Sequence, residues 1–325
     1  MVKKTLVMTV FTATSLAASA AVQAADYPTQ PIRLIVGFSA GGATDVSARL
    51  FARKMSDLLG QSVVVENKPG AAGTISADFV AKSKPDGYTI LYTSSSIHGI
   101  SPHLYDDLKW DPVKDFAPIA LAAKYPQVLL ANKEFPAADL PAFLSLAKDN
   151  PNKYSYASAG VGGTQHMAAA ILSSQANLEM VHIPYKGMSA AYPDLMAGRV
   201  QVMFDNAPSA IPFVQGDKTR ALAVSSEERI TALPDTPTVK ELGFPDYVVN
   251  AWTGFVAPAG TSPAVIEKLN QVIVQSSEDP EIQRWLHENG SPTNISGTPT
   301  EFASFMANEL EFWGKAVELS GAKQK

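Results

Sequence analysis

Short apolar runs alternate with stretches of helical spacing along the first third of the chain. The runs are rich in β-branched residues and bounded by turn residues, as is typical of buried strands, whereas the longer stretches repeat apolar residues every three or four positions. We predict strands at 32–36, 62–66 and 88–92 and helices at 46–59 and 75–81. Strands that alternate with helices indicate a parallel sheet covered by helices.

The same alternation returns after residue 150. Strands are predicted at 154–157, 180–183, 200–204 and 220–225, with helical stretches between them. Two such sets predict two sheets, and therefore two lobes. The segments 115–132 and 247–258 are long, apolar and without helical spacing. Each is therefore predicted to cross between the lobes, which permits a hinge.

The chain ends in helices that are predicted to return to the first lobe. Residues 298–301 read T-P-T-E, a capping box with proline at the first helical position, and the helix that follows is predicted to bury Phe302, Phe305 and Phe312. We expect an α/β fold in which each lobe is a mostly parallel sheet flanked by helices. The expected bounds are 25–122 and 251–325 for lobe 1 and 123–250 for lobe 2, with the second crossover within 226–258.

The N-terminus indicates secretion. Lys3 and Lys4 precede an apolar stretch, and the small residues at 22–24 suit a signal peptidase, so residues 1–24 are predicted to be a cleaved signal. The chain has no cysteine, which excludes disulfides, a lipid anchor at the cleavage site and thiolate-bound metals. Loss of the two lysines moves the formal charge from −5 to −7, which argues against nucleic-acid binding.

Residues 37–41 read G-F-S-A-G between a predicted strand and a predicted helix, the context of the nucleophile elbow in serine hydrolases. Ser39 is therefore a candidate nucleophile. Too few residues precede the motif to supply an oxyanion loop, and no histidine has an obvious orienting acid. The histidines are His98 and His166, both predicted on loops facing the ligand, and His103, His182 and His287. The hydrolase stays open as an alternative function.

The same loop is suited to hold an anion, because its small residues place backbone N–H groups at the start of a helix. A second glycine-rich loop, at 158–166, also follows a strand and opens a helix. The other strand ends carry small polar residues, and Lys186 is the one cation among them. This set of donors suits a compact ligand with one or two carboxylates. A metal is not expected, since Asp45 and Asp205 lack further ligands at metal spacing.

Several of these residues have structural alternatives to ligand contact. Thr44 and Asp45 either cap their helix or touch the ligand. Asp205 is either an N-cap or an acceptor for the ligand, and His166 is expected to form hydrogen bonds rather than to catalyse. Phe38, at the tip of a loop, either packs between the lobes or forms a face for the ligand.

Short motifs occur in a characteristic order along the mature chain. They are P-I-R-L-I-V (31–36), G-G-A-T-D (41–45), V-E-N-K-P-G (65–70), P-D-G-Y-T (85–89), H-I-P-Y-K-G (182–187), F-D-N (204–206) and L-P-D-T-P-T (233–238). In this order the motifs resemble those of the tripartite tricarboxylate transporter receptors, also called Bug proteins. The resemblance covers essentially the whole mature chain.

The resemblance implies a type II periplasmic-binding-protein fold, whose two lobes close on a ligand like a Venus flytrap. It also implies a periplasmic receptor that delivers a small carboxylate to a permease made of a large and a small membrane subunit, with no cofactor and no catalysis. A receptor that signals to a sensor protein is a further alternative, and we expect a monomer. Carried over by position, the expected ligand contacts are Phe38, Ser39, Ala43, Thr44, Asp45, Ser94, Ser95, His98, Ser158, Ala159, Gly160, Gly163, Thr164, His166, Lys186, Asp205 and Asn206.

Overall fold

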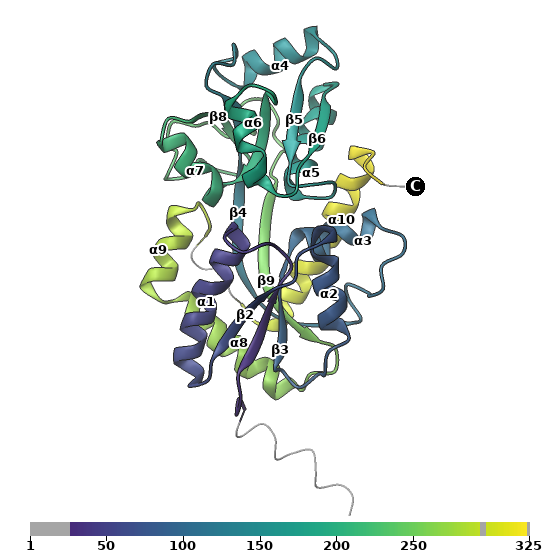
Figure 1. The fold of residues 1–325 in the computed structure, drawn as a ribbon, viewed down its shortest axis with the longest axis vertical. Helices are drawn as coiled ribbons and strands as arrows, with labels where there is room; N and C mark the ends of the chain where they lie inside the picture. The colour runs from purple at the N-terminus through teal and green to yellow at the C-terminus, as the bar shows by residue number, and fades with distance from the viewer. Residues whose placement is uncertain (1–26, 293–296, 324–325) are drawn as a thin grey trace, which may run out of the picture.

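Two α/β lobes lie end to end and are linked by two long strands (Figure 1). The computed structural model describes residues 27–292 and 297–323. The signal peptide predicted at 1–24 lies outside the described residues. Within the two described ranges, no helix combines the length and the apolar character needed to cross a bilayer.

The first sheet is built around β1 (Ile32–Val36), which pairs in parallel with β2 (Val63–Asn67) and β3 (Thr89–Ser94). On the far side of β3 lie β9 (Asn250–Pro258) and then β4 (Phe116–Asn132), both antiparallel to their neighbours. Four of the five residues of β1 are buried, as a strand covered on both faces requires. The three strands predicted in this part of the sequence are confirmed to within two residues.

The second sheet contains β5 (Ser155–Ser158), which pairs in parallel with β6 (Val181–Pro184) and β7 (Val202–Asn206). Strands β7 and β8 (Thr219–Val224) run antiparallel to the second part of β4 (Phe116–Asn132). The two lobes are confirmed, but each sheet is mixed rather than mostly parallel. The reason is that one crossing strand enters each sheet against the direction of its βαβ units, namely β9 in the first sheet and β4 in the second.

Strand β4 belongs to both sheets. Its 17 residues pair first with β9 and, from Gln127 onward, with β7 and β8. The second crossover begins in the second lobe, where the Tyr247 hydroxyl donates to the Ala168 carbonyl, and continues as β9. Both predicted crossing segments therefore run between the lobes.

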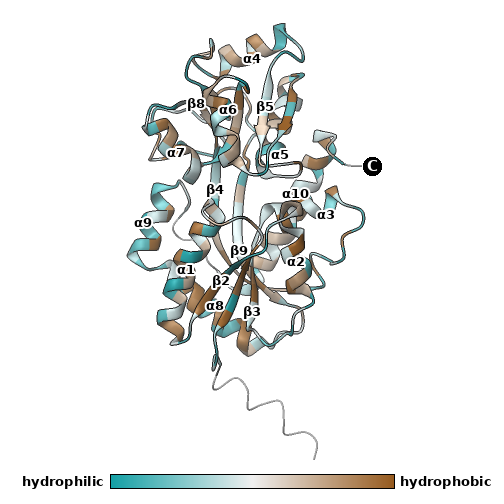
Figure 2. Cartoon of the chain, in the orientation of Figure 1, coloured by the Kyte–Doolittle hydropathy of each residue, from teal (hydrophilic) through white to brown (hydrophobic). Residues whose placement is uncertain are grey.

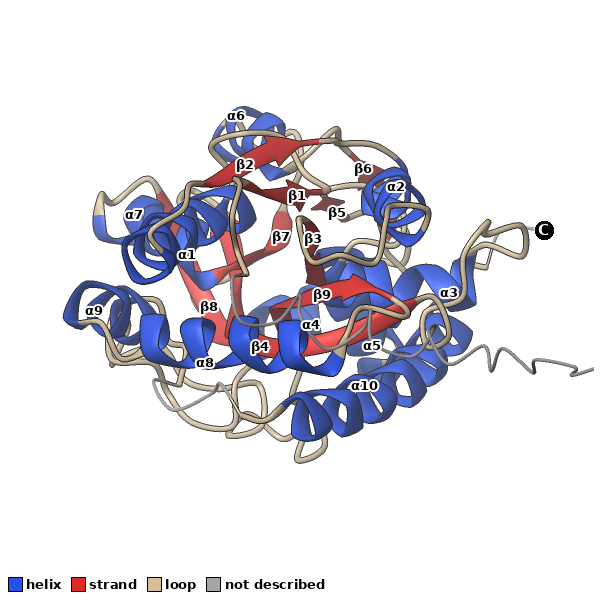
Figure 3. Ribbon diagram, turned by 90° about the horizontal axis from the view of Figure 1, so that it is seen from below, coloured by secondary structure: helices blue, strands red, loops and turns tan. Residues whose placement is uncertain are grey.

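Helices cover the outer faces of both sheets, as the view from below shows (Figure 3). They are α1 (Ala43–Leu59), η1 (Ala71–Gly73), α2 (Thr74–Ala81), η2 (Ser95–Ile100), α3 (Ser101–Leu104), α4 (Leu140–Asp149), α5 (Thr164–Ala176), η3 (Met188–Ala190), α6 (Tyr192–Met196), α7 (Ala207–Gln215), α8 (Pro263–Ser277), α9 (Pro280–Glu288) and α10 (Pro299–Ser320). Brown, apolar residues mark the strands of the first sheet in Figure 2, in keeping with their burial.

The C-terminal helix α10 forms a third link between the lobes. The predicted capping box is present at its start, and its Trp313 is fully buried in one apolar cluster with Leu104 of the first lobe and residues of α5. The prediction for its phenylalanines was partly wrong. Phe302 is buried, but Phe312 is 37% exposed, because Phe302, Met306 and Trp313 line one face of α10 and Phe312 lies about a quarter turn away from it.

Candidate functional site

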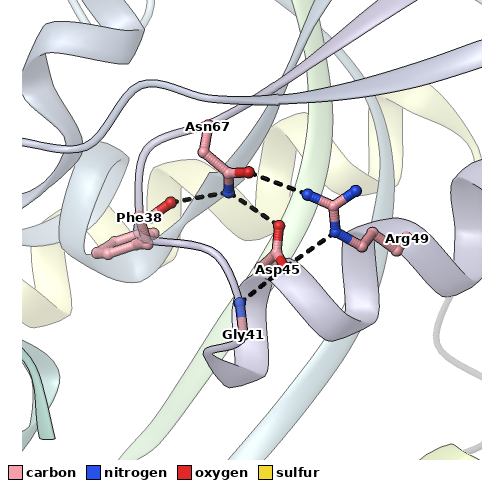
Figure 4. Close-up of polar contacts among 5 residues, drawn as sticks. All are labelled: Phe38, Gly41, Asp45, Arg49 and Asn67. Carbon is pink, nitrogen blue, oxygen red and sulfur yellow. Dashed lines mark hydrogen bonds and ion pairs between the residues drawn. The ribbon is translucent and has the colours of Figure 1, made fainter. Parts of the chain in front are cut away.

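The loop after β1, residues 37–42 (loop A), is held from behind by Asp45. The carboxylate of Asp45 is only 2% exposed, and it accepts hydrogen bonds from the Gly41 amide at 2.9 Å and the Asn67 amide group at 2.8 Å. It also pairs with Arg49 at 3.0 Å, and Asn67 donates to the Phe38 carbonyl at 2.9 Å (Figure 4). Burial opposes ionisation, but these hydrogen bonds outweigh it and hold the pKa of Asp45 below its usual value. Asp45 therefore fixes the loop, and its predicted contact with the ligand stays a prediction.

Loop A leads directly into the N-terminus of α1. Helix α1 begins at Ala43, and Gly42 at the N-cap supplies no side-chain acceptor. The first N–H groups of a helix have no partner within the helix, so they are free to bind a ligand. Gly37 is required at the base of the loop, because a Cβ there would lie 2.6 Å from the Ser76 hydroxyl oxygen. Phe38 is half-buried and packs against the core of the first lobe.

Ser39 is exposed on loop A, and the described part of the chain joins no histidine to it by a hydrogen bond. His98, predicted on a loop, instead lies in the short helix η2 (Ser95–Ile100) and is buried. Its ring is 2% exposed and lies 4.5 Å, centroid to centroid, from Phe116, while Nδ1 bonds the Thr93 hydroxyl at 2.5 Å. Burial lowers the pKa of His98 to about 3, so this imidazole is a neutral core residue.

The loop after β5, residues 159–163 (loop B), is held by two stacked imidazoles. The rings of His166 and His182 lie 3.9 Å apart at 5°. His182 Nε2 lies 2.7 Å from the Ser158 hydroxyl, and His166 Nδ1 accepts a hydrogen bond from the Gly162 amide at 3.3 Å. Burial lowers the pKa of both histidines to about 4, and for His166 the neighbouring His182 adds to this shift. The stack is therefore neutral near pH 7 and stabilises the loop.

Ser158 and His182 form a hydroxyl–imidazole pair that the sequence did not reveal. Ser158 is completely buried, and its hydroxyl also lies 3.0 Å from the Gly160 carbonyl. Within the described residues no carboxylate hydrogen-bonds the His182 ring. A nucleophile needs access to substrate and an oriented base, so this pair serves the loop rather than chemistry.

The ends of β6 and β7 bring two further predicted residues close to loop B. The Tyr185 amide donates to the Ser158 carbonyl at 2.9 Å, which places the exposed Lys186 beside the loop. Asp205 is 2% exposed and accepts from the Tyr192 hydroxyl and the Asn206 amide, both at 2.8 Å. Burial raises its pKa to about 6. Asp205 is not an N-cap, because Asn206 takes that position in α7 without a side-chain bond.

The predicted contacts therefore fall into groups of different exposure. Ser39 and Lys186 are exposed; Phe38, Ala43, Thr44, Ala159, Gly160, Gly163 and Asn206 are half-buried; and Asp45, Ser94, Ser95, His98, Ser158, Thr164, His166 and Asp205 are buried. Loop A and loop B both follow the carboxyl ends of parallel strands, the edge at which α/β sheets bind ligands. Figure 1 shows these strand ends at the level where the two lobes meet.

Comparison with known proteins decides the family. A family model described as "Tripartite tricarboxylate transporter family receptor" matches residues 47–321. The chain belongs to this family.

Similar proteins agree with that assignment. The protein BugT of Bordetella pertussis is 35% identical over 308 residues, which are 94% of each chain. A solved R. palustris protein with adipate has a TM-score of 0.86 and 31% identity, covering 91% of this chain and 99% of that one. MatC from Rhodopseudomonas palustris with bound malate has a TM-score of 0.82 and 32% identity, covering 90% and 100%. Both the family and the fold predicted from the sequence are confirmed.

One structural feature of this tripartite tricarboxylate transporter receptor was missed by sequence reasoning. Ser47 of α1, Tyr92 of β3, Tyr125 of β4 and Thr253 of β9 form a buried chain of hydroxyl groups with oxygen separations of 2.5–3.0 Å. The chain ties the first turns of α1 to both crossing strands. No local pattern marks it, because each hydroxyl occupies an ordinary inward position of its own element.

Proposed function

We propose that this receptor binds a small carboxylate between its lobes and passes it unaltered to a membrane permease with a large and a small subunit. Compounds such as adipate and malate, found with the two R. palustris relatives, are the first candidates. The observation that carries the proposal is the repeated construction of loop A and loop B. Each is fixed from inside by buried side chains, and each leads into a helix whose first main-chain amides have no partner within the helix.

Main-chain amides suit this cargo. Several N–H groups at a helix start bind a carboxylate without a salt bridge, and the helix dipole adds to the attraction. The amide of Ala43 illustrates the point, since the described residues offer it no hydrogen-bond acceptor. Lys186, exposed beside loop B, adds positive charge on the other side.

Closure and location complete the proposal. Lobe 1 (25–122 and 251–325) and lobe 2 (123–250) rotate about the two crossing segments, which contain β4 and β9. The receptor acts in the periplasm after loss of residues 1–24. We propose no catalysis, because Ser39 stands on an exposed loop with no imidazole bonded to it among the described residues.

The test removes one amide without disturbing the helix. Proline is favoured at the first helical position, and Gly42 has the extended backbone (φ −78°, ψ 166°) that a residue before proline needs. Ala43→Pro therefore deletes one N–H donor, while Ala43→Ser keeps it and serves as the matched control. Loss of one hydrogen bond to a charged group corresponds to roughly 10- to 100-fold weaker binding.

The measurement is isothermal titration of the purified receptor with a panel of small mono-, di- and tricarboxylates. We expect Ala43→Pro to bind the best carboxylate at least about tenfold more weakly than Ala43→Ser, at equal thermal stability of the free proteins. Equal affinity of the two variants would show that the start of α1 does not hold the cargo. Hydrolysis of an ester that disappears in Ser39→Ala would instead establish the hydrolase.

A further inference from the structure

A second cavity lies behind the crossing strands, away from loop A and loop B. It has a volume of about 140 Å³ and lies between β4, β9 and α10. Lys124 of β4 is paired directly with Trp252 of β9, so both side chains point to the same face, toward Phe305 and Glu309 of α10. The neighbouring residue Tyr125 points to the opposite face, where its ring lies 5.8 Å from that of Trp285.

Two opposite charges line this cavity separately. The Lys124 ammonium lies 4.6 Å from the centre of the Phe305 ring, and the Glu309 carboxylate accepts a hydrogen bond from the Trp313 indole at 2.8 Å. Among the described residues no ion pair joins Lys124 to Glu309. Burial raises the pKa of Glu309, and this effect outweighs the hydrogen bond from Trp313 and the attraction of Lys124, which both lower it.

Two buried polar atoms of the lining are unsatisfied. Neither the Asn250 side-chain carbonyl nor the Trp252 indole N–H has a hydrogen-bond partner among the described residues, although the Trp252 indole lies close enough to Glu309 to help lower the pKa of that carboxylate. Each such atom costs about 1–3 kcal/mol unless a partner is supplied. The cavity volume is about ten times the volume that one water molecule needs, so the cavity admits a small organic molecule.

We propose that this cavity is a second ligand site, which takes a small zwitterion with an apolar body, of the α-amino acid class. The carboxylate of the ligand meets Lys124, its ammonium meets Glu309 and the Asn250 carbonyl, and its side chain packs on Phe305 and Phe312. A ligand with only a carboxylate would be repelled by Glu309, and a ligand with only an ammonium group would be repelled by Lys124. The site shares no predicted contact with loops A and B, so it stands independently of the proposed cargo.

The experiment titrates leucine into the full mature receptor and follows the indole N–H resonances by NMR. The Trp252→Phe variant assigns the Trp252 signal, which reports on this cavity and not on the loops. Two analogues are titrated in parallel: 4-methylpentanoate, which lacks the ammonium, and isoamylamine, which lacks the carboxylate. We expect leucine to shift the Trp252 signal in a saturable way and both analogues to bind about tenfold more weakly or worse.

Variants test the two charges. Glu309→Gln keeps an acceptor for Trp313, and Lys124→Met keeps the apolar stem. Each is expected to weaken leucine binding about tenfold or more. Glu311→Gln, on the exposed side of the same helix, is the matched control and should bind normally. A Trp252 signal that is unmoved by millimolar leucine would overturn the site. If both charge variants bound leucine normally, or if 4-methylpentanoate bound as tightly as leucine, the proposal that the ligand is a zwitterion would be refuted.

Discussion

Removal of the Asp45 carboxylate tests whether loop A is fixed from inside. In Asp45→Ala the Gly41 amide, the Asn67 side chain and Arg49 lose a common acceptor. Gly41 and Arg49 are exposed and can turn to water, but Asn67 is half-buried and also bridges to Phe38. The loop should therefore loosen while the sheet beneath it stays intact.

The magnitude follows from these contacts. Hydrogen bonds to an ionised group contribute about 1.5–3 kcal/mol each, but the exposed amide recovers part of this from water. The Arg49 side chain is 50% exposed, so its ion pair adds less than about 1 kcal/mol. We expect a loss of about 2–3 kcal/mol in the free energy of unfolding, which lowers Tm by roughly 3–5 °C.

The assay is calorimetric unfolding of the mature protein with and without saturating carboxylate. Asp57→Ala is the matched control, because Asp57 is an exposed acid on the same helix. The pKa of Asp45 is held below its usual value, so its contribution is complete above about pH 4 and is lost as the pH falls through the folded-state pKa. The Tm values of the unmodified protein and of Asp45→Ala should therefore converge as the solution becomes acidic. A Tm at pH 7 no lower than that of the control would refute the reasoning.

Two further predictions concern loop B and the base of loop A. Since the folded protein keeps His166 and His182 neutral, with pKa values lowered to about 4, the unfolded chain protonates first. Stability should be full above about pH 6.5 and fall toward pH 4, and His182→Gln should flatten this fall in Tm. Gly37→Ala should lose about 1–3 kcal/mol in denaturant unfolding, because its Cβ would clash with Ser76 at 2.6 Å, whereas Gly42→Ala should be nearly neutral.

Much of the fold could be predicted because its signals are local. The β-branched runs became β1, β2 and β3, the T-P-T-E motif became a capping box, and the two glycine-rich segments follow strands and open helices. Each of these features depends on residues within one turn or one strand of each other. A periodic pattern or a cap is therefore readable before any long-range contact is known.

The site was less predictable because its side chains act across elements. The motif G-G-A-T-D shows that Asp45 stands at a helix start, but only the return of β2 brings Asn67 to it and fixes its role. His98 and His166 are both predicted on loops, yet packing buries one beside Phe116 and stacks the other on His182. Which of the predicted contacts reach the cargo stays a prediction.

The sequence by itself determined the two lobes, the crossing strands, the family and the two glycine-rich loops that open helices. The tertiary structure alone decided which polar side chains hold those loops, how α10 joins the lobes, and where a cavity remains behind β4 and β9. The physical reason is the range of the interactions along the chain. Secondary structure follows from interactions between neighbours in the chain, whereas the ionisation and exposure of a side chain depend on groups that only folding brings beside it.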